Sequence, residues 1–121
     1  MRSKGPSRKK NRPDRRELRE EALRPSPYLG YDRDEIGRYL MEREAWDLAE
    51  AQFRRAVWLN PYEPVFKADL ARCLICQGKM EEALKLIAEA LESRPGDEGI
   101  ARLKKIAEDG ISAGKAGEKK S

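Results

Sequence analysis

The sequence contains no histidine, and its only two cysteines are Cys73 and Cys76. Histidine is the commonest general base and the commonest metal ligand, so its absence argues against most hydrolytic and metal-dependent chemistry. The sequence also has no glycine-rich phosphate loop and no motif that activates a nucleophile. We therefore predict a protein that is not an enzyme, with no catalytic residue, no bound metal and no cofactor.

Cys73-Leu-Ile-Cys76 has the C-x-x-C spacing of redox and metal motifs. A zinc site needs about four ligands, and the chain offers no further cysteine and no histidine. A thioredoxin-like motif stands at the start of a helix after a strand, whereas this one lies inside a predicted helix. We interpret both cysteines as small packing residues. An iron–sulfur or zinc site shared across a dimer is the open alternative.

Long apolar stretches are also missing. No segment approaches the roughly 18 apolar residues of a membrane span. The basic N-terminus is not followed by the apolar stretch of a secretory signal, so we expect a cytoplasmic protein. Aromatic residues make up 7% of the chain and charged residues 40%, which allows a layered helical array but not a large core.

The charge is divided unevenly along the chain. Residues 1–27 hold ten Lys/Arg and four Asp/Glu, a net charge of +6. Residues 28–109 hold thirteen and seventeen, a net charge of −4, and residues 110–121 hold three and one, a net charge of +2. A basic arm thus precedes an acidic body, and we expect the two to have different tasks.

The basic arm, residues 1–27, is predicted to be mostly disordered, because it cannot bury enough apolar surface to offset the entropy of ordering. A capping box at Asp14–Glu17 predicts a short helix over 15–24, ended by Pro25 and Pro27. Through residues 1–16 the arm could be a solvated extension, contact nucleic-acid phosphate or lie on an anionic membrane surface. The candidate phosphate-contacting residues are Arg2, Lys4, Arg8, Lys9, Lys10 and Arg12.

Two segments of the acidic body, residues 49–61 and 83–95, repeat one pattern at an offset of 34. The matching pairs are Ala49 and Ala83, Phe53 and Ile87, Ala56 and Ala90, and Pro61 and Pro95. Within each copy the spacing of four and three puts the apolar residues on one helix face, and proline ends the helix. A second apolar set precedes each copy at the same offset: Ile36, Gly37 and Leu40, then Leu70, Ala71 and Leu74. Each unit is therefore predicted to be helix–turn–helix.

This set of residues resembles the tetratricopeptide repeat family. The resemblance implies an all-α fold, a fragment of an α-solenoid, with repeat one at 30–63 and repeat two at 64–97. A capping helix at 98–109 completes a domain over 28–109, and 110–121 is expected to be a flexible tail. Within the units we predict helices at 33–43, opened by a capping box at Asp32 and Glu35, and at 46–59, 64–77 and 79–93. Glu44 stands where the family has a turn glycine, which unit two supplies as Gly78, and Arg33 and Lys67 stand at the family's tryptophan position.

The resemblance also implies a concave groove, lined by the first helix of each unit, that binds a partner segment. Its positions in this chain are Tyr31, Asp34, Arg38, Met41, Glu42, Val65, Ala68, Arg72, Ile75 and Cys76. We expect Arg38 and Arg72 to pair with carboxylates of an acidic and hydrophobic segment. The family's carboxylate clamp needs lysine and asparagine where Asp34 and Arg38 stand, so that specific function is not expected.

Two further expectations concern single side chains. No carboxylate stands in an apolar setting that would raise its pKa, so all are read as solvated. Trp58, Tyr62 and Phe66 could form an exposed aromatic patch at the bend between the units.

Together these observations predict a non-enzymatic protein–protein interaction adaptor. The alternative is a small RNA- or ribosome-associated protein whose basic arm contacts phosphate. Two repeats are fewer than the three usually needed for stability. We therefore expect compensation by the last helix, by residues 15–31 packing on the first repeat or by self-association into a homo-oligomer.

Overall fold

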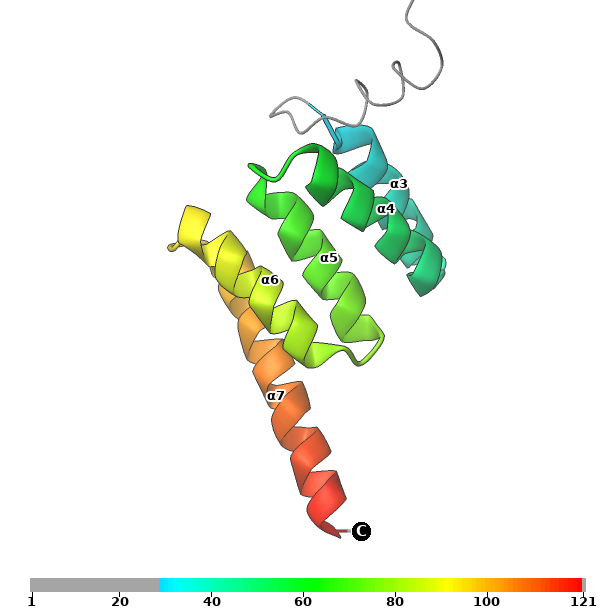
Figure 1. Cartoon of the computed structure of the whole chain (residues 1–121). Coiled ribbons are helices and arrows are strands. Elements are labelled where there is room, and N and C mark those ends of the chain that lie inside the picture. The colour runs from blue at the N-terminus through cyan, green and yellow to red at the C-terminus, as the bar shows by residue number, and fades with distance from the viewer. Residues whose placement is uncertain (1–28, 121) are drawn as a thin grey trace, which may run out of the picture.

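A computed structural model describes the backbone of residues 29–120 and the side chains of residues 29–114. This part of the chain forms five helices and no strand, which confirms the all-α prediction (Figure 1). The helices are α3 (Tyr31–Glu42), α4 (Trp46–Leu59), α5 (Pro64–Cys76), α6 (Met80–Ser93) and α7 (Glu98–Lys120). None of them is both long and apolar enough to cross a bilayer. The predicted disorder of 1–27, the helix at 15–24 and the phosphate-contacting arm lie outside the described residues.

Successive helices pack against one another as two helical hairpins and a final helix. α3 pairs with α4, α5 pairs with α6, and α7 lies along α6 (Figure 1). The two hairpins meet where α4 packs on α5. Helix α5 also contacts both α3 and α7, so these three helices adjoin along one side of the molecule. We call them the first-position helices, because α3 and α5 are the first helices of their units and α7 follows α6 as α5 follows α4.

The repeated positions form the core of each hairpin. The side chains at these positions of α4 and α6 are fully buried: Ala49, Phe53, Ala56, Ala83, Ile87 and Ala90. A Cβ atom added to Gly37 would lie 2.5 Å from the Phe53 ring, so α3 and α4 approach more closely than any larger residue permits. Alanine and glycine at these positions therefore allow the close crossing of the two helices in a hairpin.

Ile36 departs from this repeat. Its counterpart Leu70 is 2% exposed, because α4 of the preceding unit packs against α5, whereas Ile36 is 41% exposed. No described helix precedes α3, so the same position has no neighbour to cover it. The repeated pattern predicts the residue type at position 36 but not its burial.

Helix α3 begins two residues earlier than predicted, and the capping box at Asp32 and Glu35 is not formed. Gly30 is the N-cap residue, with φ at 95°, and its carbonyl accepts a hydrogen bond from the Asp34 N–H at 2.9 Å. A Cβ at position 30 would lie 2.7 Å from the Phe66 ring. Only glycine combines this left-handed backbone with so close an approach.

The turns inside the two hairpins have the same geometry although their sequences differ. In the first turn the N–H groups of Arg43, Glu44 and Ala45 donate to Leu40, Met41 and Leu40. The equivalent bonds in the second turn run from Gln77, Gly78 and Lys79 to Leu74, Ile75 and Leu74. The left-handed position is occupied by Gly78 at φ 82° and by Glu44 at φ 59°. The missing glycine of unit one therefore leaves the turn intact but strained.

The prediction that the last helix ends at residue 109 is wrong. Helix α7 continues to Lys120. A Cβ atom added to Gly110 would lie 2.8 Å from the Met80 methyl group at the start of α6. Gly110 is therefore a point of close approach inside the helix.

Replacing Glu44 with glycine is expected to stabilise the protein by about 0.5–1 kcal/mol, because it removes the strain of a left-handed non-glycine residue. Urea unfolding monitored by circular dichroism measures the change. The matched control is Glu35→Gly in the exposed middle of α3, which should lose about 1 kcal/mol of stability. A Glu44→Gly variant that is destabilised as much as the control would contradict the strained turn.

Replacing Gly37 with alanine is expected to destabilise the protein by about 1–3 kcal/mol, since the methyl group overlaps the Phe53 ring. This sign opposes helix propensity, which favours alanine by about 1 kcal/mol. Phe53→Leu should cost less in the Gly37→Ala background than in the wild type, as a thermal-melt double-mutant cycle would reveal. Gly96→Ala, at a turn with open space around it, is the neutral control.

Candidate binding groove

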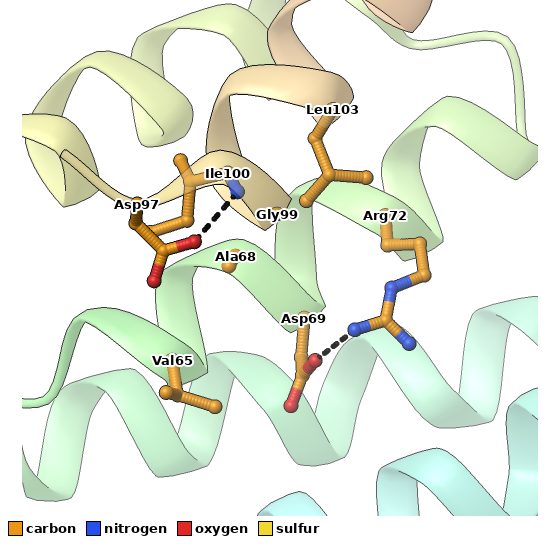
Figure 2. A pocket seen from close by; sticks show the side chains of 8 residues that line it. All are labelled: Val65, Ala68, Asp69, Arg72, Asp97, Gly99, Ile100 and Leu103. Atoms are coloured by element: carbon orange, nitrogen blue, oxygen red, sulfur yellow. Dashed lines mark hydrogen bonds and ion pairs between the residues drawn. The ribbon is translucent and has the colours of Figure 1, made fainter.

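A hollow of about 260 Å³ lies between α5 and α7, on the side of the molecule where the first-position helices adjoin (Figure 2). Its lining residues come from both helices and the turn before α7: Val65, Ala68, Asp69, Arg72, Asp97, Gly99, Ile100 and Leu103. Apolar side chains from both helices contribute to its surface, and three charged groups lie among them. The hollow therefore offers both apolar contact and ionic pairing to a ligand.

Local helix geometry brings these residues together. The lining residues of α5 are three, one and three positions apart, so they share one face of the helix. Asp97 precedes α7, and its carboxylate accepts a hydrogen bond from the Ile100 N–H at 3.0 Å. This cap sets the direction in which α7 leaves the turn. As a result the first turns of α7 lie opposite the first half of α5.

Three of the predicted groove residues, Val65, Ala68 and Arg72, line the hollow. Tyr31, Arg38 and Glu42 are exposed on α3, and Cys76 is exposed at the end of α5. Met41 and Ile75 are partly buried and pack against the core, so little of their apolar surface faces outward. Asp34 was expected at the groove surface but is only 3% exposed, because the side of α3 that carries it faces α5.

The prediction missed five lining residues: Asp69, Asp97, Gly99, Ile100 and Leu103. The 34-residue register would have found two of them, since Gly99 follows Val65 and Leu103 follows Asp69 at that offset. The sequence predicts this last helix only as a cap on repeat two. In the structure α7 also occupies the place of a third first-position helix.

The two groove arginines are already ion-paired within the chain. Arg38 Nε lies 3.2 Å from Asp34 Oδ2, and an Arg72 terminal nitrogen lies 2.5 Å from Asp69 Oδ1. Each arginine thus pairs with an aspartate about one turn before it on the same helix. Their positive charge is offset before any ligand arrives.

Asp34 and Asp69 form a buried carboxyl pair between α3 and α5, each 3% exposed. The Oδ1 atom of Asp34 has no hydrogen-bond partner among the described residues. Burial, then the adjoining Asp69 carboxylate, raise the pKa of Asp34 to about 8, against the opposing effect of Arg38 and Arg72. The expectation that no carboxylate has a raised pKa is therefore wrong. The pKa of Asp34 is raised by the contact between the two units, and the residue pattern of a single helix does not reveal this contact.

The aromatic side chains near the bend do not form the predicted patch. Trp58 and Tyr62 are 50% and 66% exposed, but Phe66 is fully buried. The Phe66 ring packs edge-on against Tyr31, with ring centroids 4.9 Å apart, and the Tyr31 hydroxyl donates to Glu63 at 2.8 Å. This hydrogen bond is the main cause of the raised pKa of Tyr31. These contacts tie the start of α3 to the start of α5.

Cys73 shows the features of a packing residue, whereas the interpretation of Cys76 as a packing residue is wrong. Cys73 is buried, its thiol donates to the Trp46 carbonyl at 3.3 Å, and burial raises its pKa, which disfavours the reactive thiolate. Cys76 is exposed at the end of α5. Among the residues that the structure describes, no group of three or more His, Cys, Asp or Glu side chains is arranged to hold a metal ion.

A second hollow lies at the first turn and is lined by Glu44, Ala45, Trp46, Asp47, Leu48 and Gln77. Its volume is about 490 Å³, but it is not on the side formed by the first-position helices. It therefore serves as a comparison surface for the groove.

Replacing Asp34 with asparagine should remove a pH dependence of stability. The folded state keeps a proton on Asp34 up to about pH 8, whereas the unfolded state releases it near 3.8, so wild-type stability should fall as pH rises across this range. At pH 8.5 the variant should exceed the wild type by about 1–3 kcal/mol. Urea unfolding at pH 4 to 8.5 measures this, with Asp32→Asn as control. Parallel curves for wild type and Asp34→Asn would contradict the buried pair.

Comparison with known proteins agrees with this geometry. A family model described as tetratricopeptide repeat matches residues 40–106, more than half of the 121-residue chain. No curated protein matches the chain. Repeats of this family generally mediate protein–protein interaction and generally act as non-enzymatic scaffolds. The paired helices, the repeated small residues and the family match together show that the chain belongs to the tetratricopeptide repeat family.

Proposed function

We propose that the protein is a cytoplasmic, non-enzymatic adaptor that binds a partner segment along its concave side. The observation that carries this proposal is the hollow between α5 and α7, with its apolar surface open to solvent. Val65, at its mouth, is 38% exposed although it is a branched apolar side chain. A partner side chain that covers this surface gains the usual free energy of apolar burial.

The size of the hollow favours a protein segment over a small-molecule ligand. Pockets for drug-sized molecules and cofactors usually enclose about 300–1,000 Å³. The hollow, at about 260 Å³, is smaller and is open on one side. It suits one or two side chains of a segment whose remainder runs over α3 and α5. Tyr31 and Arg38, both exposed on α3, lie along that course.

The same geometry argues against catalysis at this site. Among the described residues, the one carboxyl group with a strongly raised pKa is that of Asp34, which is buried between α3 and α5 and does not line the hollow. A general acid must reach the substrate within hydrogen-bond distance. Asp34 acts on the groove only through its neighbour Asp69.

Site-specific photo-cross-linking tests the proposal. An aliphatic diazirine side chain at Val65, close to valine in size, should cross-link a protein partner in cells, because this position faces the segment. The matched position is Leu48, which is 62% exposed at the second hollow and should give no product. Equal cross-linking at both positions, or cross-linking at Leu48 alone, would contradict the groove. Mass spectrometry of the product identifies the partner.

A further inference from the structure

The negative charges that line the hollow outnumber the positive ones. Its lining residues include the carboxylates of Asp69 and Asp97 and the guanidinium of Arg72, a formal net charge of −1. Figure 2 shows Asp97 and Asp69 on either side of Ala68, with Arg72 meeting Asp69 on the side away from Asp97. The surface between the two carboxylates is therefore apolar and bordered by negative charge.

Behind Asp69 lies the second carboxyl group of the buried pair. Asp34 is only 3% exposed, and its Oδ1 atom has no hydrogen-bond partner among the described residues. Arg38 pairs with Asp34, and Arg72 pairs with Asp69. With its pKa raised to about 8, Asp34 keeps its proton at neutral pH, so Asp69 is the carboxylate of the pair that borders the hollow.

We propose that the hollow binds a lysine or arginine side chain of the partner segment, an inference that rests on the groove function above. The alkyl stem lies on Val65, Ala68, Ile100 and Leu103, and the cationic group pairs with Asp69, facing Asp97. Lysine and arginine suit such a surface because their stems are apolar and their ends are charged. The low exposure of Asp69 strengthens the ion pair, since little water screens it.

The alternative ligand, a carboxylate held by Arg38 and Arg72, is disfavoured by the same contacts. A carboxylate that approaches Arg72 would meet Asp69 beside it, and like charges in close contact repel. Arg72 would also have to leave a 2.5 Å ion pair with Asp69. The partner is therefore a basic and apolar segment instead of an acidic and apolar one.

Peptide selection tests this inference with the full-length chain as bait. A phage-displayed library of random peptides is selected against the wild type and against Val65→Trp, which blocks the mouth with bulk and adds no charge. Only peptides that bind the wild type and do not bind Val65→Trp count as groove ligands. Subtracting the blocked variant also removes peptides that bind the basic residues near the N-terminus.

The groove ligands should carry Lys or Arg next to apolar residues. In Asp69→Asn the amide oxygen can still accept from Arg72, and in Asp97→Asn asparagine caps α7 as well as aspartate does. Asp97→Asn should therefore keep its melting curve, and Asp69→Asn, which also alters the buried pair with Asp34, is compared at a temperature at which circular dichroism shows it folded. Both should bind a selected synthetic peptide about 10-fold more weakly, which corresponds to about 1.4 kcal/mol. The control Glu92→Gln removes the same charge from an exposed position of α6 and should bind normally.

Two outcomes overturn the inference, and they are distinguishable. If the groove ligands are acidic or show no charge preference, the cation site is wrong but the groove function stands. If every peptide selected on the wild type also binds Val65→Trp, the groove function fails as well. Folded Asp69→Asn and Asp97→Asn variants that bind the basic peptide as tightly as the wild type would also overturn the inference.

Discussion

The close approach of paired helices at small residues is the constraint on which this structure depends. Gly37 lies against the Phe53 ring, and Ala71 and Ala90 are fully buried in the second hairpin. Interiors are close-packed, so a larger residue at such a crossing would separate the helices. Because both hairpins obey this constraint at a 34-residue offset, α5 stacks on α4 in a defined register. That stacking places α3, α5 and α7 along one side.

The stacking also determines the chemistry of that side. Where α3 meets α5, Asp34 and Asp69 are withdrawn from water, and each faces an arginine from its own helix. Burial of a charge is costly unless it is paired, so Asp34 keeps its proton at neutral pH while Asp69 pairs with Arg72. The groove is thus not a neutral apolar surface with two free arginines. It has an apolar surface bordered by carboxylates, and this reverses the charge expected of a ligand.

Much of this fold could be predicted from sequence, for reasons that particular residues illustrate. Helix α4 has its predicted bounds of 46–59, because its apolar positions recur at helical spacing and Pro61 follows its end. The N-cap at Gly30 and the continuation of α7 through Gly110 were not predicted, because each glycine is explained by a distant partner, Phe66 or Met80. Glycine is a common signal for helix ends, and only tertiary contact shows which glycines allow close packing instead.

The groove was harder to predict than the fold. Its α5 residues follow from helical periodicity, but the burial of Asp34 and the contribution of Ile100 depend on how neighbouring units stack. A repeat pattern describes one unit, whereas burial belongs to the contact between units. Ile36 and Leu70 make the same point, since equivalent positions differ in exposure when one lacks a neighbour.

Hydrogen–deuterium exchange of the full-length chain, with and without the partner segment captured through Val65, tests the central claim most directly. The account predicts slower exchange on binding in the first turns of α5 and α7, with unchanged exchange on the outer faces of α4 and α6. Protection centred on α4 and α6, or at the second hollow near Leu48, would contradict a partner held in the groove between α5 and α7.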